Sequence, residues 1–254
     1  MTKILNYDEF SMNEGLFDKY KRPKLSEKAL RVVVKQKLDF NKRTGLYDSR
    51  GDVKITDQDL EDGRFPVKFG TIKGNFDCSG CNTLVSLKGG PVEVKGNCNV
   101  SECKKLESLE GAPKYVGKSF SCWGCKGITS LWKGPEKVKE GYGCSNCENL
   151  VSLKGAPEKV TTFKCMNCKS LDSLKGSPEK VSGTFDCSGC GIKDFIGSPK
   201  NLGSAFVCKD CENLESLEGL DPNFKGKLTI QNCPKVKQNP KYKRQIPKKC
   251  DYVI

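Results

Sequence analysis

The sequence predicts a mainly β solenoid, a chain wound into many similar short turns around a thin core. The first observation is a period. The second cysteine of a Cys-x-x-Cys pair recurs every 21 or 22 residues, at positions 81, 103, 125, 147, 168, 190, 211 and 233. A fixed period of about 20–50 residues is typical of repeat architectures. The second observation is the pattern inside each period, in which an aromatic, strand-like segment precedes the cysteines and a Gly-x-Pro corner follows them.

Each repeat contributes three apolar positions to the predicted core. The aromatic position and the first cysteine position are two residues apart, so both side chains point to the same face of a strand. The aromatic position holds Phe76, Cys98, Phe120, Tyr142, Phe163, Phe185, Phe206 and Leu228. The first cysteine position holds Cys78, Val100, Cys122, Cys144, Cys165, Cys187, Cys208 and Ile230. The following leucine position holds Leu84, Leu106, Ile128, Leu150, Leu171, Ile192, Leu214 and Val236.

These repeats divide the chain into three parts. Residues 1–52 form a leader and a small α/β cap, in which Ser26 is a helix N-cap and a short helix passes into a strand at 38–40. Residues 53–236 form the solenoid, with a degenerate first repeat at 53–71 and eight clear repeats at 72–236. Residues 237–254 form a basic C-terminal cap. We expect one parallel sheet of about nine short strands, with loops and 3₁₀ turns on the return side, because too few residues remain there for a helix.

The repeat resembles that of a known family. Val-x-x-Phe-x-Cys-x-x-Cys-x-x-Leu is similar to the leucine-rich-repeat segment Leu-x-x-Leu-x-Leu-x-x-Asn/Cys-x-Leu, although most copies here have one extra residue before the aromatic. This resemblance covers residues 53–236 and implies a horseshoe or arc. The whole layout, with Tyr-Asp-Glu-Phe near the start, also looks like repeat proteins encoded by tailed, T4-like bacteriophages. The segment 12–15 resembles the cleavage point of head-targeting leaders in those phages.

Composition limits the classes of function. The chain has 254 residues, 16 cysteines and no histidine, which removes Ser-His-Asp and Cys-His catalytic sites and mixed Cys/His zinc sites. No secretory signal and no membrane-spanning stretch is visible, so we expect free thiols in a reducing cytosol. The net charge of +13 is uneven: residues 224–254 carry nine Lys/Arg and one acidic residue, while residues 72–223 carry 20 and 18. We therefore expect no enzyme and no cofactor.

Cys-x-x-Cys is also a known half-site for zinc and iron–sulfur clusters, so the cysteines have alternative interpretations. Val100 and Ile230 replace the first cysteine, which indicates a position for apolar packing. The second cysteine is never replaced. We interpret it as a structural ladder whose side chains bond to loop backbone, formed by Cys81, Cys103, Cys125, Cys147, Cys168, Cys190, Cys211 and Cys233. Metal binding and redox chemistry remain as alternatives, and no metal ligand is predicted.

The predicted binding surface is the concave face of the sheet, the usual binding face of a solenoid. Most outward positions on it are small and polar. Large or charged side chains interrupt that pattern and are the candidate binding residues Trp123, Lys164, Met166, Asp186 and Lys209. Tryptophan is enriched in binding hot spots, and methionine suits adaptable surfaces. Local packing of Trp123 against the sheet edge is the alternative, and Trp132 is expected to cover a turn.

The basic run Lys235–Lys249 has two interpretations. It is a nucleic-acid contact or, as we favour, a cap that blocks the last sheet edge with charge and proline. Its three prolines are expected to prevent regular structure. Together these observations predict a non-enzymatic interaction scaffold, phage-encoded and located in the host bacterial cytoplasm, that binds a protein partner. The alternatives are a structural or internal head component of the virion and a Cys-x-x-Cys metal protein.

Overall fold

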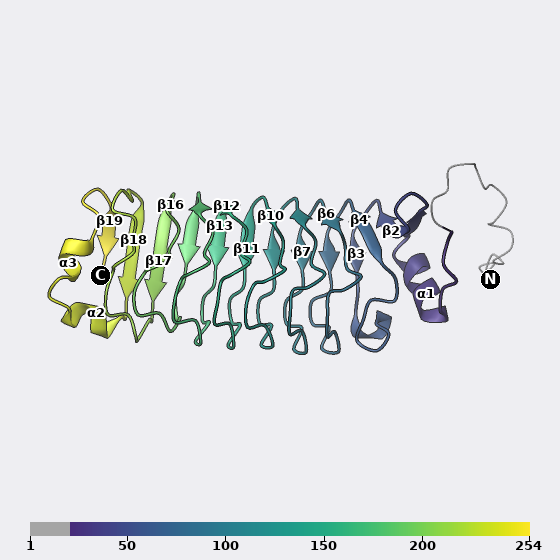
Figure 1. The fold of residues 1–254 in the computed structure, drawn as a ribbon, viewed down its shortest axis with the longest axis horizontal. Helices are drawn as coiled ribbons and strands as arrows, with labels where there is room; N and C mark the ends of the chain where they lie inside the picture. Colours follow the sequence, from purple (N-terminus) through teal and green to yellow (C-terminus); the bar gives the residue numbers. More distant parts are fainter. Residues whose placement is uncertain (1–20) are drawn as a thin grey trace.

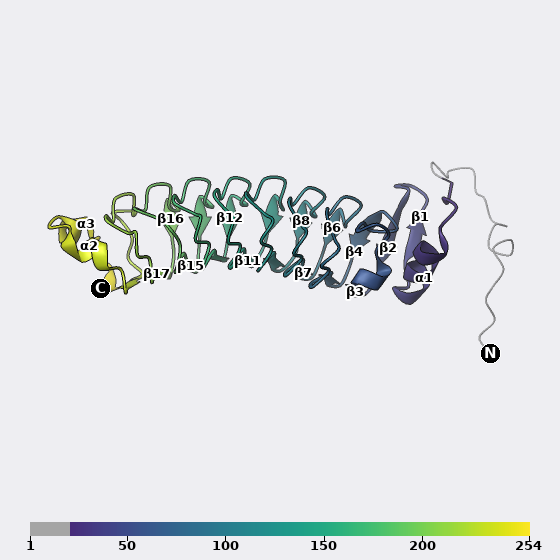
Figure 2. The same ribbon diagram turned by 90° about the horizontal axis from the view of Figure 1, so that it is seen from below.

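The computed structural model describes residues 21–254, which form an elongated rod of stacked turns (Figure 1). The leader segment at 12–15 lies outside the described residues. The period of the sequence becomes the pitch of the rod, because each repeat makes one turn and pairs with the turns before and after it. Figure 2 shows that the rod bends only gently along its length.

A ten-stranded sheet runs along one side of the rod, and all its strand pairs are parallel. The predicted parallel sheet is thereby confirmed. Most strands have only two or three residues, because the chain turns both before and after each strand. In chain order the strands are β3 (Val53–Lys54), β5 (Phe76–Asp77), β7 (Cys98–Asn99), β9 (Phe120–Ser121), β11 (Gly141–Gly143), β13 (Thr162–Lys164), β15 (Thr184–Asp186), β17 (Ala205–Lys209), β18 (Lys227–Gln231) and β19 (Asp251–Val253).

The return side carries a second row of short strands where loops and 3₁₀ turns were predicted. These strands come from the Pro-x-x-Val segment that opens each repeat. They are β4 (Phe69–Ile72), β6 (Glu93–Val94), β8 (Tyr115–Val116) and β10 (Lys137–Val138), followed by a separate group of β12 (Lys159–Val160), β14 (Lys180–Val181) and β16 (Asn201–Leu202). Hydrogen-bonded strands keep the same spacing on both rows, about 4.8 Å. The turns therefore stack almost straight, and the rod does not close into a horseshoe.

The core is a narrow column of side chains between the two rows. Aromatic rings in consecutive repeats lie over one another: Tyr142 and Phe163 have centroids 5.5 Å apart, and Phe163 and Phe185 are 5.6 Å apart with nearly parallel planes. All three residues in this stack are at most 1% exposed. The column is continuous because each repeat places its aromatic residue opposite that of the next repeat in the parallel register.

The N-terminal cap covers the first turn of the solenoid. Helix α1 (Glu27–Lys35) begins at Ser26, whose hydroxyl oxygen accepts a hydrogen bond from the Ala29 N–H at 3.0 Å. Strands β1 (Asp39–Asn41) and β2 (Leu46–Ser49) form an antiparallel hairpin, and β2 continues into the second row through β4. The 3₁₀ helix η2 (Asp57–Asp59) follows β3. The predicted helix, the strand near 38–40 and the first solenoid strand after 53 are all present.

The C-terminal segment is regular, so the prediction that its prolines prevent regular structure is wrong. Helix α2 (Pro234–Gln238) begins with proline, helix α3 (Tyr242–Gln245) follows it, and β19 pairs with β18. Proline suits the first helical position because its missing N–H would have no partner there. Tyr242 and Ile246 pack on the core, whereas Tyr252 and Val253 are 58% and 45% exposed.

Candidate functional site: the sheet face and the cysteine ladder

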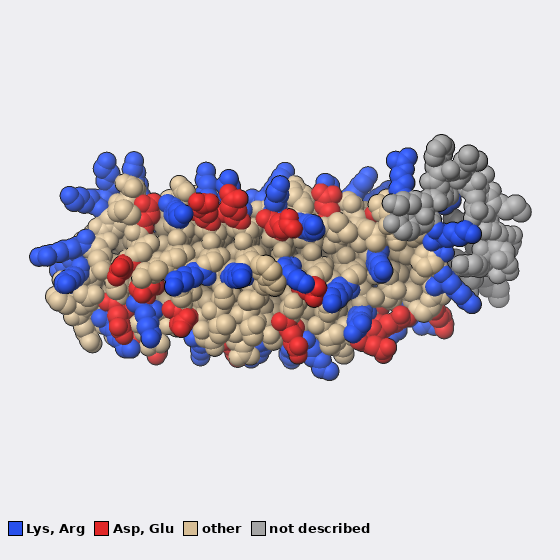
Figure 3. Space-filling model, viewed as in Figure 1, with Lys and Arg blue, Asp and Glu red and all other residues tan. Residues whose placement is uncertain are grey.

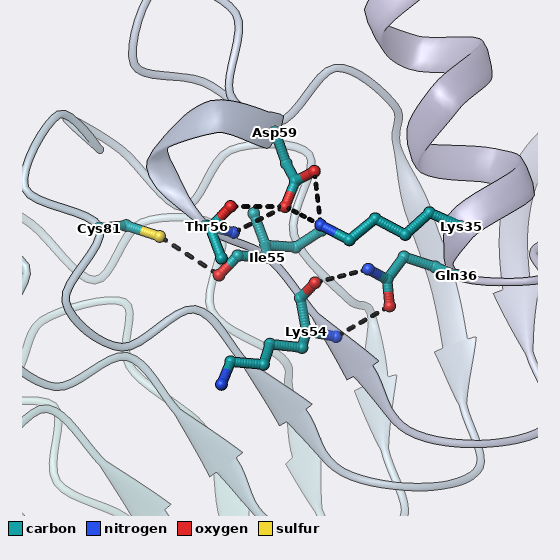
Figure 4. Close-up of polar contacts among 7 residues, drawn as sticks. All are labelled: Lys35, Gln36, Lys54, Ile55, Thr56, Asp59 and Cys81. Atoms are coloured by element: carbon teal, nitrogen blue, oxygen red, sulfur yellow. Dashed lines mark hydrogen bonds and ion pairs between the residues drawn. The ribbon is translucent and has the colours of Figure 1, made fainter.

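The second cysteine of every repeat is buried and bonds to the preceding repeat. Its thiol donates to the carbonyl oxygen of the first cysteine position one turn earlier, as Cys81 does to Ile55 in Figure 4. The Sγ to O distances from Cys81 to Cys233, in chain order, are 3.5, 3.2, 3.1, 3.2, 3.2, 2.9, 3.4 and 3.7 Å. These bonds satisfy buried carbonyl groups, which would otherwise destabilise the fold.

Nearly all of the cysteine thiols are shielded from solvent. Every cysteine among residues 21–254 is free, and only Cys250 is not buried. Burial raises the pKa of the Cys81 thiol to about 12 and raises that of Cys98 as well. A thiol with a raised pKa stays protonated at neutral pH and is a weak nucleophile.

The residue before each ladder cysteine turns the chain with a left-handed backbone, which the sequence analysis did not predict. Its φ angle is positive in all eight repeats, for example 58° at Asn146 and Asn167. The signal was present, because this position holds mostly Gly, Asn or Asp, the residues that tolerate this conformation. Four of these side chains also bond in pairs between neighbouring turns: Asn167 Nδ2 donates to Asn146 Oδ1 at 2.9 Å, and Asn232 Nδ2 donates to Asp210 Oδ1 at 2.8 Å.

Small polar side chains on the outer face of the ten-stranded sheet close the turn at the end of each strand. Asp77 Oδ1 accepts the N–H of Ser79, and Asn99 Oδ1 accepts the N–H of Ser101. Asp186, predicted as a binding residue, makes the same contact, since its Oδ1 accepts from both the N–H and the hydroxyl of Ser188 at 3.0 and 2.6 Å. The carboxylate of Asp186 is thus committed to the turn.

The remaining candidate residues lie on the same face, in two neighbouring rows. Trp123 is 40% exposed, Lys164 is exposed, and Met166 and Lys209 are half-buried. Hydrogen bonds from Gly124 N to Ser145 O and from Asn146 N to Met166 O place Trp123, Ser145 and Met166 in one row across three turns. Parallel strands are about 4.8 Å apart, so Trp123 and Met166 stand about 10 Å apart along the rod.

The positions between Trp123 and Met166 on the sheet face hold a small side chain or none. Only Ser145 separates them in their row, and its side chain is occupied because its Oγ accepts the N–H of Met166 at 3.1 Å. The neighbouring row has no side chain at Gly143, where a Cβ would meet only the Ser121 Oγ, at 3.7 Å. Trp123 and Met166, which has Lys164 as its neighbour, are thus separated only by a small side chain and a glycine.

Trp132 lies at a Gly-x-Pro corner, away from the sheet face, and is 56% exposed. The Lys154 ammonium lies 4.9 Å from the centroid of its ring. Ion pairs link neighbouring corners, with Glu110 bonded to both Lys88 and Lys133. Figure 3 shows that acidic and basic side chains alternate along both long edges of the face in view, while basic side chains gather at the C-terminal end.

Comparisons of the chain with protein-family models, with curated proteins and with solved structures found no match. Among the described residues 21–254, no helix has the length and apolar character needed to cross a membrane. The geometry of the molecule is therefore the basis for any proposal about its function.

Proposed function

We propose that this chain is a non-enzymatic scaffold that binds a protein partner through the outer face of its ten-stranded sheet. The observation that carries this proposal is the pair of large apolar side chains Trp123 and Met166, which have only Ser145 and Gly143 between them on this face. Elsewhere on strands β3 to β18 the outward side chains are mostly small and polar. An exposed tryptophan and a half-buried, flexible methionine provide apolar area for a partner's side chain.

A capture experiment with the full chain as bait tests the proposal. Trp123→Ala and Met166→Ala each remove one of the two large apolar side chains, and each is expected to weaken recovery of a bound partner by about tenfold or more, as expected for a hot spot. Trp132→Ala is the matched control, because it removes the other exposed tryptophan, which lies at a corner away from the sheet face. Equal recovery with Trp123→Ala and Trp132→Ala would refute the sheet-face site.

The family and the origin are also proposals. A period of 21 or 22 residues and a ladder cysteine after each strand support a leucine-rich-repeat relationship. We propose a bacteriophage origin and action in the host cytoplasm on the resemblance of the layout alone. Mass spectrometry of purified phage particles tests the location, because presence of the chain in the virion would favour the structural alternative.

A contact with nucleic acid through Lys235–Lys249 is not favoured. Lys235 bonds to Asn213 Oδ1 at 3.2 Å and lies 3.7 Å from a Glu215 carboxylate oxygen. We propose instead that α2, α3 and β19 form an end cap, which the last repeat of a solenoid needs.

A further inference from the structure

Three thiols converge at the C-terminal end of the cysteine ladder. The Sγ atoms of Cys208, Cys211 and Cys233 all lie within 4.8 Å of one another, and all three residues are buried. Cys208 and Cys211 form one Cys-x-x-Cys pair, and Cys233 is the ladder cysteine of the next repeat. Across residues 21–254, no other three cysteine or carboxylate side chains bring their ligand atoms this close together.

The thiol of Cys233 is held least firmly by the ladder. Its Sγ lies 3.7 Å from the carbonyl oxygen of Cys208, whereas this distance is 2.9–3.5 Å in the other seven repeats. It also donates to the Gln231 carbonyl oxygen at 3.3 Å. The first cysteine position of the same repeat is Ile230, so no further sulfur lies in that strand. The ladder bond of Cys233 is therefore the longest of the eight.

A surface hollow leads to this cluster. It lies between the turns of the last two repeats and α2, and its lining includes Cys233, Glu212, Asn232 and Lys237. The hollow thus reaches the cluster at Cys233, and the thiols of Cys208 and Cys211 lie within 4.8 Å of the Cys233 thiol.

We propose that Cys208, Cys211 and Cys233 bind one soft d¹⁰ cation, either Cu(I) with three thiolate ligands or Zn(II) with a water from the hollow as fourth ligand. Thiolates select such ions. Metal–sulfur bonds are about 2.3 Å long, so the three sulfurs need to approach to about 4 Å from one another, a movement of less than about 1 Å. Binding converts three thiols to thiolates and releases three protons to solvent.

Titration of the full chain, kept reduced without oxygen by a non-thiol reductant, tests the site. Cu(I) and Zn(II) are added separately in competition with a chromophoric chelator. The diagnostic variant is Cys208→Val, and Cys187→Val is its matched control, since Cys187 holds the same position one repeat earlier and is equally buried. Val100 shows that this position accepts valine.

We expect one tightly bound ion per chain for the wild type and for Cys187→Val, and binding at least about a hundredfold weaker for Cys208→Val. Tighter binding of Cu(I) would indicate three thiolate ligands, and tighter binding of Zn(II) would indicate three thiolates with a water as the fourth ligand. Absence of stoichiometric binding of both ions, several ions per chain, or equal affinity in the two variants would overturn the proposal. Thermal unfolding verifies that each variant is folded, and Cys211→Ser replaces Cys208→Val if that variant does not fold.

Discussion

At the scale of single residues, the two cysteines of each repeat have different roles despite their proximity. The first packs in the core column, in a position that Val100 and Ile230 also occupy. The second donates to a carbonyl oxygen 24–26 residues earlier in the chain, as in the bond from Cys147 Sγ to Cys122 O at 3.2 Å. Substitutions at the two positions therefore remove different interactions.

Cys147→Ala and Cys144→Val separate these roles within one repeat. Cys147→Ala removes the donor and a buried sulfur, and it leaves the Cys122 carbonyl with only the 3.3 Å bond from the Cys125 N–H, so the free energy of unfolding is expected to fall by about 1–3 kcal/mol. Cys144→Val keeps an apolar side chain of similar size, and its backbone carbonyl still accepts from Cys168, so the expected loss is below about 1.5 kcal/mol. Urea unfolding under reducing conditions measures both. A larger loss for Cys144→Val would contradict the packing role of the first position.

Comparison of the repeats was sufficient to identify the first cysteine position as an apolar packing position. That position holds Cys, Val or Ile, which share only moderate size and apolarity. The comparison could not identify the carbonyl acceptors, which depend on how one turn stacks on the next. It also could not single out Cys208, Cys211 and Cys233. Their approach depends on small displacements at the end of the ladder, and these are not encoded in a residue pattern.

At the scale of elements, strands of two to five residues have no stability alone and exist because neighbouring turns pair with them. This explains which elements were predictable. Helix α1 has its own cap and was expected, whereas the second row of strands arises only when Pro-x-x-Val segments stack. The sequence did not predict the C-terminal helices, because Pro234, Pro240 and Pro247 were expected to prevent regular structure. Pro234 begins α2, and the other two stand at the boundaries of α3.

The N-terminal cap joins the solenoid through Asp59, whose carboxylate contacts Lys35 of α1 and the N–H and hydroxyl of Thr56 (Figure 4). Burial raises the pKa of Asp59, but the bonds from Lys35 and Thr56 outweigh it and hold the pKa below its usual value. A carboxylate with a lowered pKa stabilises the fold above its unfolded pKa of about 3.9, and this contribution is lost as the pH falls through the folded pKa.

Asp59→Asn is therefore expected to lower the melting temperature at pH 7 and to reduce its further fall between pH 5 and pH 2. The loss at pH 7 is expected to be about 1 kcal/mol, because the Lys35 side chain is half-exposed and solvent screens the pair. Asp62→Asn is the control, since it removes an exposed carboxylate three residues later. Parallel pH profiles for wild type and Asp59→Asn would show that this carboxylate does not contribute.

At the scale of the whole molecule, the fold is a one-dimensional array. Each turn contacts mainly its two neighbours, through paired strands on both rows and through stacked side chains between them. In such an array stability is approximately the sum of the contributions of turns and interfaces. The length of the rod is then not fixed by a closed core, and a whole turn can be removed without changing the contacts that remain.

Deletion of residues 76–97 tests this property, because it removes one period of 22 residues together with β5 and β6. The new junction joins Lys73-Gly74-Asn75 to Cys98, which reproduces the native sequence Lys95-Gly96-Asn97 before the same cysteine. We expect a folded chain with an unchanged circular-dichroism shape and a lower melting temperature, since one turn and the Phe76 contacts with Phe65 and Phe69 are lost.

Deletion of residues 76–86, half a period, is the control. It places the Leu87 segment where a strand should begin and shifts every later apolar position out of register. That variant is expected to be unfolded or aggregated in size-exclusion chromatography. If both deletions behave alike, the turns are not independent units and the additive description of the rod fails.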